Sequence, residues 1–324
     1  MIKTRFTEMF GIKYPIVQTG MQWLGIPSFA SAVCNAGAMG TINVSCWPTP
    51  EEFHENVKLM KSLTDKPFIV NVSLTKGLTK GEEVVKYIDI CKEEKVACIE
   101  TAGDNPKDLI GYIHDAGIYP LHKCPNYNVS MSMQRRGADL ITIAGYEVAG
   151  HPSQDGVGTF MIARRVAKDA KIPVIAAGGV ADGHGLAAAL CLGASAVGMG
   201  TRMICTTECT ISDNHKQWVV EHTEKDTVLA QKTFSMMRVA RNNASLLSNE
   251  MEARGATFEE LYEICSGRKA GEAYKTGNVD GGVFACGQAA GLIDDIVPVK
   301  VLVERMAKEA EETLGSVCAY FVEG

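Results

Sequence analysis

The chain has 324 residues, of which 46% are hydrophobic and 22% are charged, the composition of an ordinary soluble globular protein that can bury a large core. Its formal net charge of -6 argues against a basic face that binds nucleic acid. No apolar run is long enough to cross a membrane, and the N-terminal segment MIKTRFTEMFGIKYP lacks the apolar core of a signal peptide. We therefore expect a cytoplasmic protein.

The cysteines give no sign of a metal site or a disulfide framework. There are 11 of them, scattered along the chain with no C-x-x-C pair. A structural zinc site would need more closely spaced ligands, so no metal is expected. We predict reduced, mostly buried thiols.

Apolar segments of strand length recur along the first 205 residues. They lie at 15–21, 38–45, 67–74, 96–103, 119–124, 139–146, 173–179 and 196–203. Most are continuously apolar rather than alternating, which is typical of parallel strands covered on both faces.

Segments with a helical pattern separate these strands, at 28–37, 51–63, 82–95, 105–117, 129–137, 160–170 and 185–193. Several end in glycine, a common signal for the C-terminus of a helix. Alternating strands and helices form right-handed βαβ units, and eight strands predict an α/β fold of the (β/α)8 TIM barrel type. An open doubly wound sheet is the alternative, weakened because no G-x-G-x-x-G follows the first strand.

The pattern changes after Met203. Residues 207–285 are more polar and are predicted to be helical, with 232–255 as the longest stretch. We interpret them as a small inserted helical subdomain that contacts substrate or acts as a lid. Residues 1–206 and 286–324 would then form the barrel, with 285–314 returning as its closing helix.

Two glycine-containing segments follow the seventh and eighth predicted strands: Gly178 with Gly179, and Gly200 with Thr201. TIM barrels often bind phosphate at this position through backbone N–H groups, and glycine allows the close approach of backbone to phosphate. Simple turn glycines are the alternative. Their joint position in an eightfold pattern favours phosphate binding.

Three polar residues at the ends of predicted strands are candidates for the chemistry. Asn71 and Lys123 interrupt apolar strands, and buried polar groups need partners, which a cofactor or an internal hydrogen bond would supply. His151 follows the sixth strand, and histidine suits proton transfer or hydrogen bonding to a carbonyl. An exposed loop histidine is the alternative.

Seven segments together resemble the nitronate monooxygenase-like flavoproteins, also known as 2-nitropropane dioxygenase-like proteins. They are GMQWLG (20–25), ETAGDNP (100–106), HKC (122–124), GYEVAGHP (145–152), AAGGVADGHGLAAAL (176–190), GMGTRM (198–203) and RVARN (238–242). The resemblance covers nearly the whole chain and is closest to the NADH:quinone reductase branch. FMN-type enoyl-ACP reductases are more distant relatives.

The resemblance implies FMN bound on a TIM barrel. It assigns the flavin phosphate to the two glycine segments, and places His151 near the flavin. It also assigns further residues to the ring and ribityl chain: Asn71, Lys123, Ala149 and Gly150 around them, and Gly20, Met21 and Gln22 along one side.

The third strand is followed by SLTKGLTKGEE (73–83), without the proline that the NADH branch carries in this loop. The choice between NADH and NADPH therefore stays open. Arg238 and Arg241, in RVARN, are either structural or contacts for a dinucleotide or CoA phosphate.

Our leading interpretation is an FMN-dependent oxidoreductase that passes electrons from NAD(P)H to a quinone or a similar electrophilic small molecule, with His151 and Lys123 as catalytic residues. The flavin would carry the redox chemistry and the protein would position it. Three alternatives remain: a nitronate monooxygenase using oxygen, an enoyl-thioester or activated-alkene reductase, and a non-redox phosphate-binding barrel or non-catalytic flavin-binding protein. A homodimer is possible.

Overall fold

The computed structural model describes residues 2–74, 81–318 and 320, and the central part of the loop 73–83 lies outside these residues. The barrel strands are β1 (Ile16–Gln18), β2 (Thr41–Asn43), β3 (Ile69–Leu74), β4 (Cys98–Gly103), β5 (Tyr119–Cys124), β6 (Leu140–Ala144), β7 (Val174–Ala177) and β8 (Ala196–Met199). Every predicted strand is present, and all except the fifth are shorter than predicted.

The eight strands form one parallel sheet in the order β1-β8-β7-β6-β5-β4-β3-β2. Its two edges meet, because Val17 and Met39 form a parallel bridge. The Gln18 amide donates to the Met39 carbonyl at 2.9 Å, and the Met39 amide donates to the Ile16 carbonyl at 2.9 Å. The prediction of a TIM barrel is confirmed.

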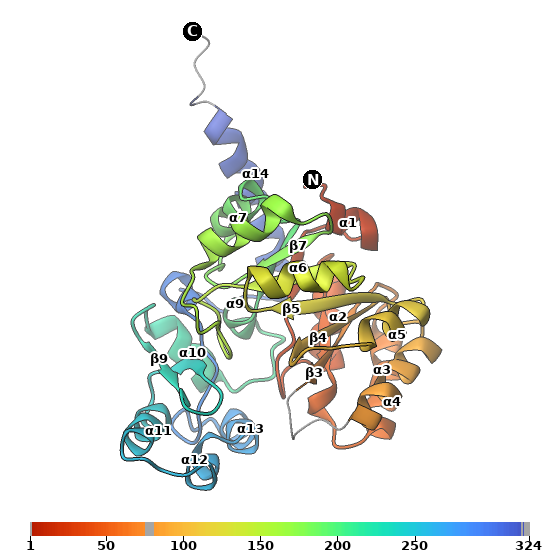
Figure 1. The fold of residues 1–324 in the computed structure, drawn as a ribbon. Helices are drawn as coiled ribbons and strands as arrows, with labels where there is room; N and C mark the ends of the chain where they lie inside the picture. Colours follow the sequence, from red (N-terminus) through yellow and green to blue (C-terminus); the bar gives the residue numbers. More distant parts are fainter. Residues whose placement is uncertain (1, 75–80, 319, 321–324) are drawn as a thin grey trace.

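Helices follow the strands and cover the outside of the barrel (Figure 1). They are α2 (Pro27–Asn35), α3 (Pro50–Leu63), α4 (Gly81–Glu93), α5 (Leu109–Asp115), α6 (Tyr127–Arg135), α7 (Thr159–Asp169) and α8 (Gly183–Cys191). Local sequence sets where several begin: the side chains of Thr49, Asn126 and Asp182 accept backbone N–H groups in the first turns of α3, α6 and α8, as N-cap residues do.

The barrel interior consists of an apolar lower layer and a polar upper layer. The lower layer packs Val17, Met39, Ile69, Cys98, Leu121, Leu140, Ile175 and Ala196 together. Phe6 and Phe10 of α1 (Arg5–Phe10), a helix that the sequence did not predict, join this layer and close the N-terminal end. Since side chains of a strand alternate between faces, the next inward residues are Thr19, Thr41, Asn71, Glu100, Lys123, Thr142, Ala177 and Gly198.

Beyond β8 the chain forms a mixed rather than purely helical subdomain, which groups at one side of the barrel (Figure 1). The short helix α9 (Thr201–Ile204) follows β8 directly, and the elements of the subdomain are α10 (Asp213–Glu221), β9 (Thr227–Ala230), β10 (Met237–Ala240), α11 (Asn243–Ala253), α12 (Phe258–Cys265) and α13 (Gly267–Thr276). The short η2 (Gln288–Leu292) and α14 (Val299–Cys318) then return to the barrel.

The prediction of a long helix at 232–255 is wrong for the first half of this segment. Residues Met237–Ala240 pair antiparallel with Thr227–Ala230. The Asn242 side chain then accepts the Ser245 amide and forms a capping box that starts α11. An N-cap residue has a non-helical backbone, so the helix cannot extend upstream through Asn242.

Most of the cysteines are buried, as the sequence predicts. The ten cysteines whose side chains are described are all unpaired, and most are buried. Within residues 2–74, 81–318 and 320, no helix combines the length and apolarity that crossing a bilayer requires.

Candidate active site

The C-terminal ends of the barrel strands bring most of the predicted site residues to one end of the barrel. A ladder of buried polar side chains crosses it. The Asn43 amide donates to Asn71 Oδ1 at 3.0 Å, and Asn71 Nδ2 donates to Glu100 Oε2 at 2.7 Å. Thr142 Oγ1 donates to the other carboxylate oxygen of Glu100 at 3.1 Å. Asn71 therefore has internal hydrogen bonds and a fixed orientation.

Sequence reasoning placed Glu100 at the end of the fourth strand but gave it no role. It is 4% exposed and accepts hydrogen bonds from Asn71 on one side and Thr142 on the other. Because a carboxylate can only accept, it fixes the direction of both hydrogen bonds. Burying a carboxylate is costly unless it is hydrogen-bonded. An acid within an otherwise apolar strand, VACIETAG, was the available signal.

The loop after β1 lies against both neighbouring strand ends. An ideal Cβ added to Gly20 would lie 2.4 Å from Asn71 Cγ, so only glycine fits. The Met21 sulfur faces the backbone of Gly200, 3.8 Å from the position that a Cβ would occupy there. Gln22 is directed elsewhere: its amide lies against Gly267 of α13, where an added Cβ would be 2.7 Å away.

Trp23 ties the same loop to the subdomain. Its indole Nε1 donates to the Gly267 carbonyl at 2.6 Å, and its backbone has a positive φ of 68°. A non-glycine residue in this region is strained and is held there by surrounding contacts. The first strand loop and α13 are thus fastened together across 244 residues of sequence.

The loop after β6 meets the β9–β10 hairpin. Gly150 and Arg238 exchange both backbone hydrogen bonds, at 3.0 and 2.6 Å. The buried Arg238 guanidinium stacks over the Tyr146 ring, and its Nε donates to the Tyr146 carbonyl at 3.1 Å. Burial lowers the pKa of Arg238. Arg238 is therefore a structural residue in this loop, and Arg241 is exposed.

Glu147 caps helix α7 from a distance. Its carboxylate accepts the Thr159 amide at 2.8 and 3.1 Å and the Thr159 hydroxyl at 2.8 Å. The N-cap residue Gly158 has no side chain for this purpose. Glu147 thereby shapes the loop that carries Ala149, Gly150 and His151.

We expect Glu147→Ala to lower the free energy of unfolding by about 1.5–3 kcal/mol, because a charged acceptor of three hydrogen bonds is lost. Glu147→Gln should cost less, since one acceptor oxygen remains. Urea denaturation measures both. The exposed Asp155, in the same loop, supplies the control variant D155N, and an equal loss in E147A and D155N would contradict the cap.

His151 and Lys123 face a common space. The His151 side chain is exposed, yet desolvation by surrounding protein lowers its pKa from 6.5, and the Lys123 ammonium lowers it further. A ring that solvent reaches on one side, while protein surrounds it on the others, is expected in an open concavity. His151 is therefore neutral at pH 7 and can donate a hydrogen bond, beside a half-buried cation.

The two glycine segments differ in backbone conformation, because Gly200 has a negative φ of -114°. Gly178 and Gly179 are consecutive residues with φ of 111° and 73°, which L side chains avoid. Thr201 is buried, and its hydroxyl accepts the Gly287 amide at 2.9 Å. An added Cβ on Gly287 would lie 3.0 Å from the Ala149 nitrogen, so this returning segment packs the ends of β6 and β8 together.

These features fit a phosphorylated flavin. Backbone N–H groups in a turn can form a concavity that binds an anion. The polar upper layer offers donors and acceptors to a ring edge, and Thr41 Oγ1 is buried there without a hydrogen-bond partner among the described residues.

Among the described residues, His54 of α3, Glu93 at the end of α4 and the adjacent Glu94 form a group with metal-ligand chemistry outside this site. Glu94 Oε1 contacts His54 Nε2 at 2.8 Å, and Glu94 Oε2 accepts a hydrogen bond from Lys61 at 2.7 Å. Because these carboxylate oxygens already have partners, the group is an ion-pair cluster between two helices.

His122 precedes Lys123 but points to the outer face of β5. It is 1% exposed, its Nδ1 lies 2.8 Å from Thr101 Oγ1, and burial lowers its pKa to about 4. In the unfolded state the His122 imidazole binds a proton at a higher pH than in the folded state. The free energy of unfolding therefore falls as the pH falls from 6.5 toward 4, and this residue accounts for about 3 kcal/mol of the loss.

We predict that His122→Asn reduces this pH dependence, because the asparagine amide can replace the Nδ1–H donor but does not titrate. Unfolding free energies at pH 7 and 4.5 measure the pH dependence of stability. Part of this dependence should remain in the variant, because burial also lowers the pKa of His215, to about 4. An unchanged difference between the two pH values would refute the assignment.

Comparisons with known proteins agree with this architecture. A family model described as nitronate monooxygenase matches residues 3–309. An octahydro-indene-carboxyl-CoA dehydrogenase of Rhodococcus jostii is 30% identical over 95% of this chain and 96% of its own. A nitronate monooxygenase of Paraburkholderia phytofirmans is 28% identical over 96% of both chains. The structure of FabK from Thermotoga maritima is 34% identical, with a TM-score of 0.92, over 99% of this chain and 100% of its own.

Proposed function

Because this chain belongs to the nitronate monooxygenase family, we propose that it is an FMN-dependent oxidoreductase that transfers electrons from NADH or NADPH to a carbonyl acceptor conjugated to a carbon–carbon double bond. Quinones and enoyl thioesters share this chemistry. The observation that carries the proposal is the neutral His151 beside Lys123 at the mouth of a polar barrel layer. When bound, FMN supplies the hydride-transfer chemistry.

The residues have separate roles in this proposal. His151 donates a hydrogen bond to the acceptor carbonyl, which makes the conjugated double bond more electrophilic. The Lys123 ammonium stabilises negative charge in the same space and keeps His151 neutral. Histidine in its neutral form acts as an electrophile in other barrels.

We assign the flavin to residues that surround this space. Gly178, Gly179, Gly200 and Thr201 would hold the phosphate. Asn71, oriented by Glu100, would meet the ring or ribityl chain, together with Ala149 and Gly150. Gly20 and Met21 would line one side, and Gln22 would lie farther out, toward α13.

Among conjugated carbonyl acceptors, a thioester has more support than a quinone. A relative at 30% identity acts, by its name, on a carboxyl-CoA compound, and the similar FabK is an enoyl reductase. Residues 207–285 would then form the subdomain that contacts the thioester carrier, because Trp23 and Gly150 fasten it to the strand loops.

Nitronate oxidation is the second candidate. The matching family model and a relative at 28% identity carry that name. A nitronate is an anion, and the Lys123 cation would attract it. The cytoplasmic location and the homodimer stay predictions from the sequence.

Anaerobic stopped-flow spectroscopy separates the candidates. The purified protein is mixed with NADH, NADPH or propyl-2-nitronate, and the flavin absorbance band is followed. We expect bleaching by a pyridine nucleotide, followed by recovery with crotonyl-CoA faster than with a benzoquinone. A response to nitronate alone would favour the second candidate. Absence of a flavin band would overturn both, and a bound flavin that responds to no donor would indicate a non-catalytic flavin-binding protein.

A further inference from the structure

The two glycine segments, 178–179 and 200–201, are each followed by a residue that is tied to the C-terminal part of the chain. The Gly183 amide, at the start of α8, donates to Glu309 Oε2 of α14 at 2.9 Å. An added Cβ on Gly183 would lie 2.4 Å from the Met306 carbonyl oxygen. The start of α8 therefore rests directly on the backbone of α14.

The second segment is tied through a buried arginine. Arg202 follows Thr201 and is 2% exposed. Its Nη2 donates to Asp295 Oδ1 at 2.8 Å and to the Cys205 carbonyl at 3.3 Å. A buried guanidinium requires such a partner, because an unpaired charge in the interior is strongly destabilising.

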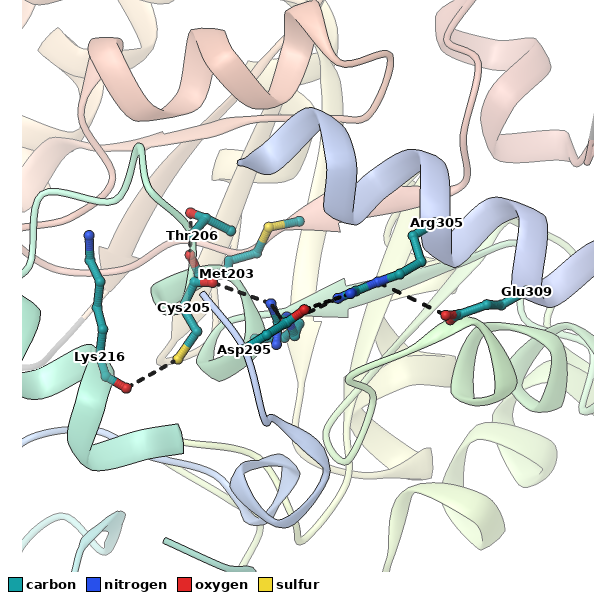
Figure 2. Close-up of polar contacts among 8 residues, drawn as sticks. Met203, Cys205, Thr206, Lys216, Asp295, Arg305 and Glu309 are labelled. Atoms are coloured by element: carbon teal, nitrogen blue, oxygen red, sulfur yellow. Dashed lines mark hydrogen bonds and ion pairs between the residues drawn. The ribbon is translucent and has the colours of Figure 1, made fainter. Parts of the chain in front are cut away.

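Asp295 connects the two ties. Arg305 of α14 donates to Asp295 Oδ2 at 2.6 Å and to Oδ1 at 3.2 Å, and its Nε lies 4.0 Å from Glu309 Oε1. Figure 2 shows Arg305 reaching from α14 toward Asp295 on one side and Glu309 on the other. The Arg305 hydrogen bonds and the Arg202 charge hold the pKa of Asp295 below its usual range.

These contacts form one continuous series of alternating charge, which we call the ion-pair chain: Arg202, Asp295, Arg305 and Glu309. It begins next to one glycine segment and ends at the helix that follows the other. Arg202 is buried, whereas Asp295, Arg305 and Glu309 are partly exposed. Ion pairs of either kind contribute little net stability, but their hydrogen-bond geometry is specific. The ion-pair chain is therefore suited to fixing the distance between the two glycine segments.

We propose that the ion-pair chain consists of positioning residues that hold the two glycine segments at the separation a phosphate requires, so that it sets selectivity for FMN over riboflavin. This inference rests on the proposed function, which places the flavin phosphate between the segments. Riboflavin lacks the phosphate and does not need both segments at once. Loosening the ion-pair chain should therefore weaken FMN binding and leave riboflavin binding nearly unchanged.

The test is titration of flavin-free full-length protein with FMN and, separately, with riboflavin, followed by flavin fluorescence. The first variant is Arg305→Met, which keeps the Arg202–Asp295 pair and the apolar stem of a side chain that is 39% exposed. The second is Asp295→Asn. We expect the ratio of riboflavin to FMN dissociation constants to fall about tenfold in each.

The matched control is Glu312→Gln, which breaks an exposed Lys308–Glu312 pair on the same helix and should leave the ratio unchanged. General destabilisation would weaken the binding of FMN and riboflavin equally, and equal weakening in Arg305→Met would overturn the inference. A wild-type ratio of dissociation constants in Arg305→Met would also overturn it. Both outcomes can be read from this variant even if Asp295→Asn does not fold. Wild-type protein that binds neither flavin would overturn the proposed function together with this inference.

Discussion

Replacing His151 with glutamine should lower the rate of acceptor reduction by about 10²–10⁴-fold, the range that a positioned proton or hydrogen-bond donor contributes. The rate at which NADH bleaches the flavin should change by about threefold or less, because His151 is assigned to the acceptor and not to the donor. Two stopped-flow experiments, one for each half-reaction, measure this difference.

The free energy of unfolding should be almost unaffected in His151→Gln. The His151 side chain is exposed, and substitutions at such positions usually change the unfolding free energy by about 0.5 kcal/mol or less. His184→Gln is the matched control, since that histidine is also exposed and lies on α8. If both half-reactions slowed equally in His151→Gln, the assignment of His151 to the acceptor carbonyl would fail.

Replacing Gly145 with alanine should reduce the free energy of unfolding by about 4 kcal/mol or more, a loss seen only with severe steric or packing defects. An ideal Cβ at this position would lie 1.9 Å from Thr159 Oγ1 and 2.5 Å from its backbone nitrogen. Thr159 cannot move away easily, because Glu147 holds its amide and hydroxyl.

The control for this variant is Gly111→Ala. Gly111 lies in α5, and a Cβ added there meets nothing within 4 Å. Alanine favours a helix over glycine by about 1 kcal/mol, so this variant should be neutral or slightly more stable. Denaturation midpoints measure both substitutions. Comparable stability of G145A and G111A would refute the close packing of α7 against the end of β6.

The sequence predicted the parts of the fold that depend on local pattern. The strands LITIA and VIAA are buried along their whole length, and continuous apolarity of this kind is typical of parallel strands covered on both faces. The hairpin strand MRVA had no such signature, because its partner TVLA and the neighbouring Asn242 cap decide its structure.

The candidate site divides in the same way. The left-handed Gly178 and Gly179 could be anticipated, because glycine at a strand end has few other uses. The Trp23–Gly267 and Thr201–Gly287 hydrogen bonds join residues far apart in sequence, and no local pattern encodes them. Glu100 was given no role because its partners, Asn71 and Thr142, lie on other strands.

The separation of the barrel interior into two layers has an evolutionary consequence. Adjacent inward positions of one strand, such as Ile69 and Asn71 or Cys98 and Glu100, serve different purposes, since the first packs with the apolar lower layer and the second joins the polar ladder. Selection for a new substrate can alter the upper positions and the loops while the lower positions preserve folding. Such a division is consistent with relatives of 28–30% sequence identity that are named for nitronate oxidation and for CoA-ester dehydrogenation.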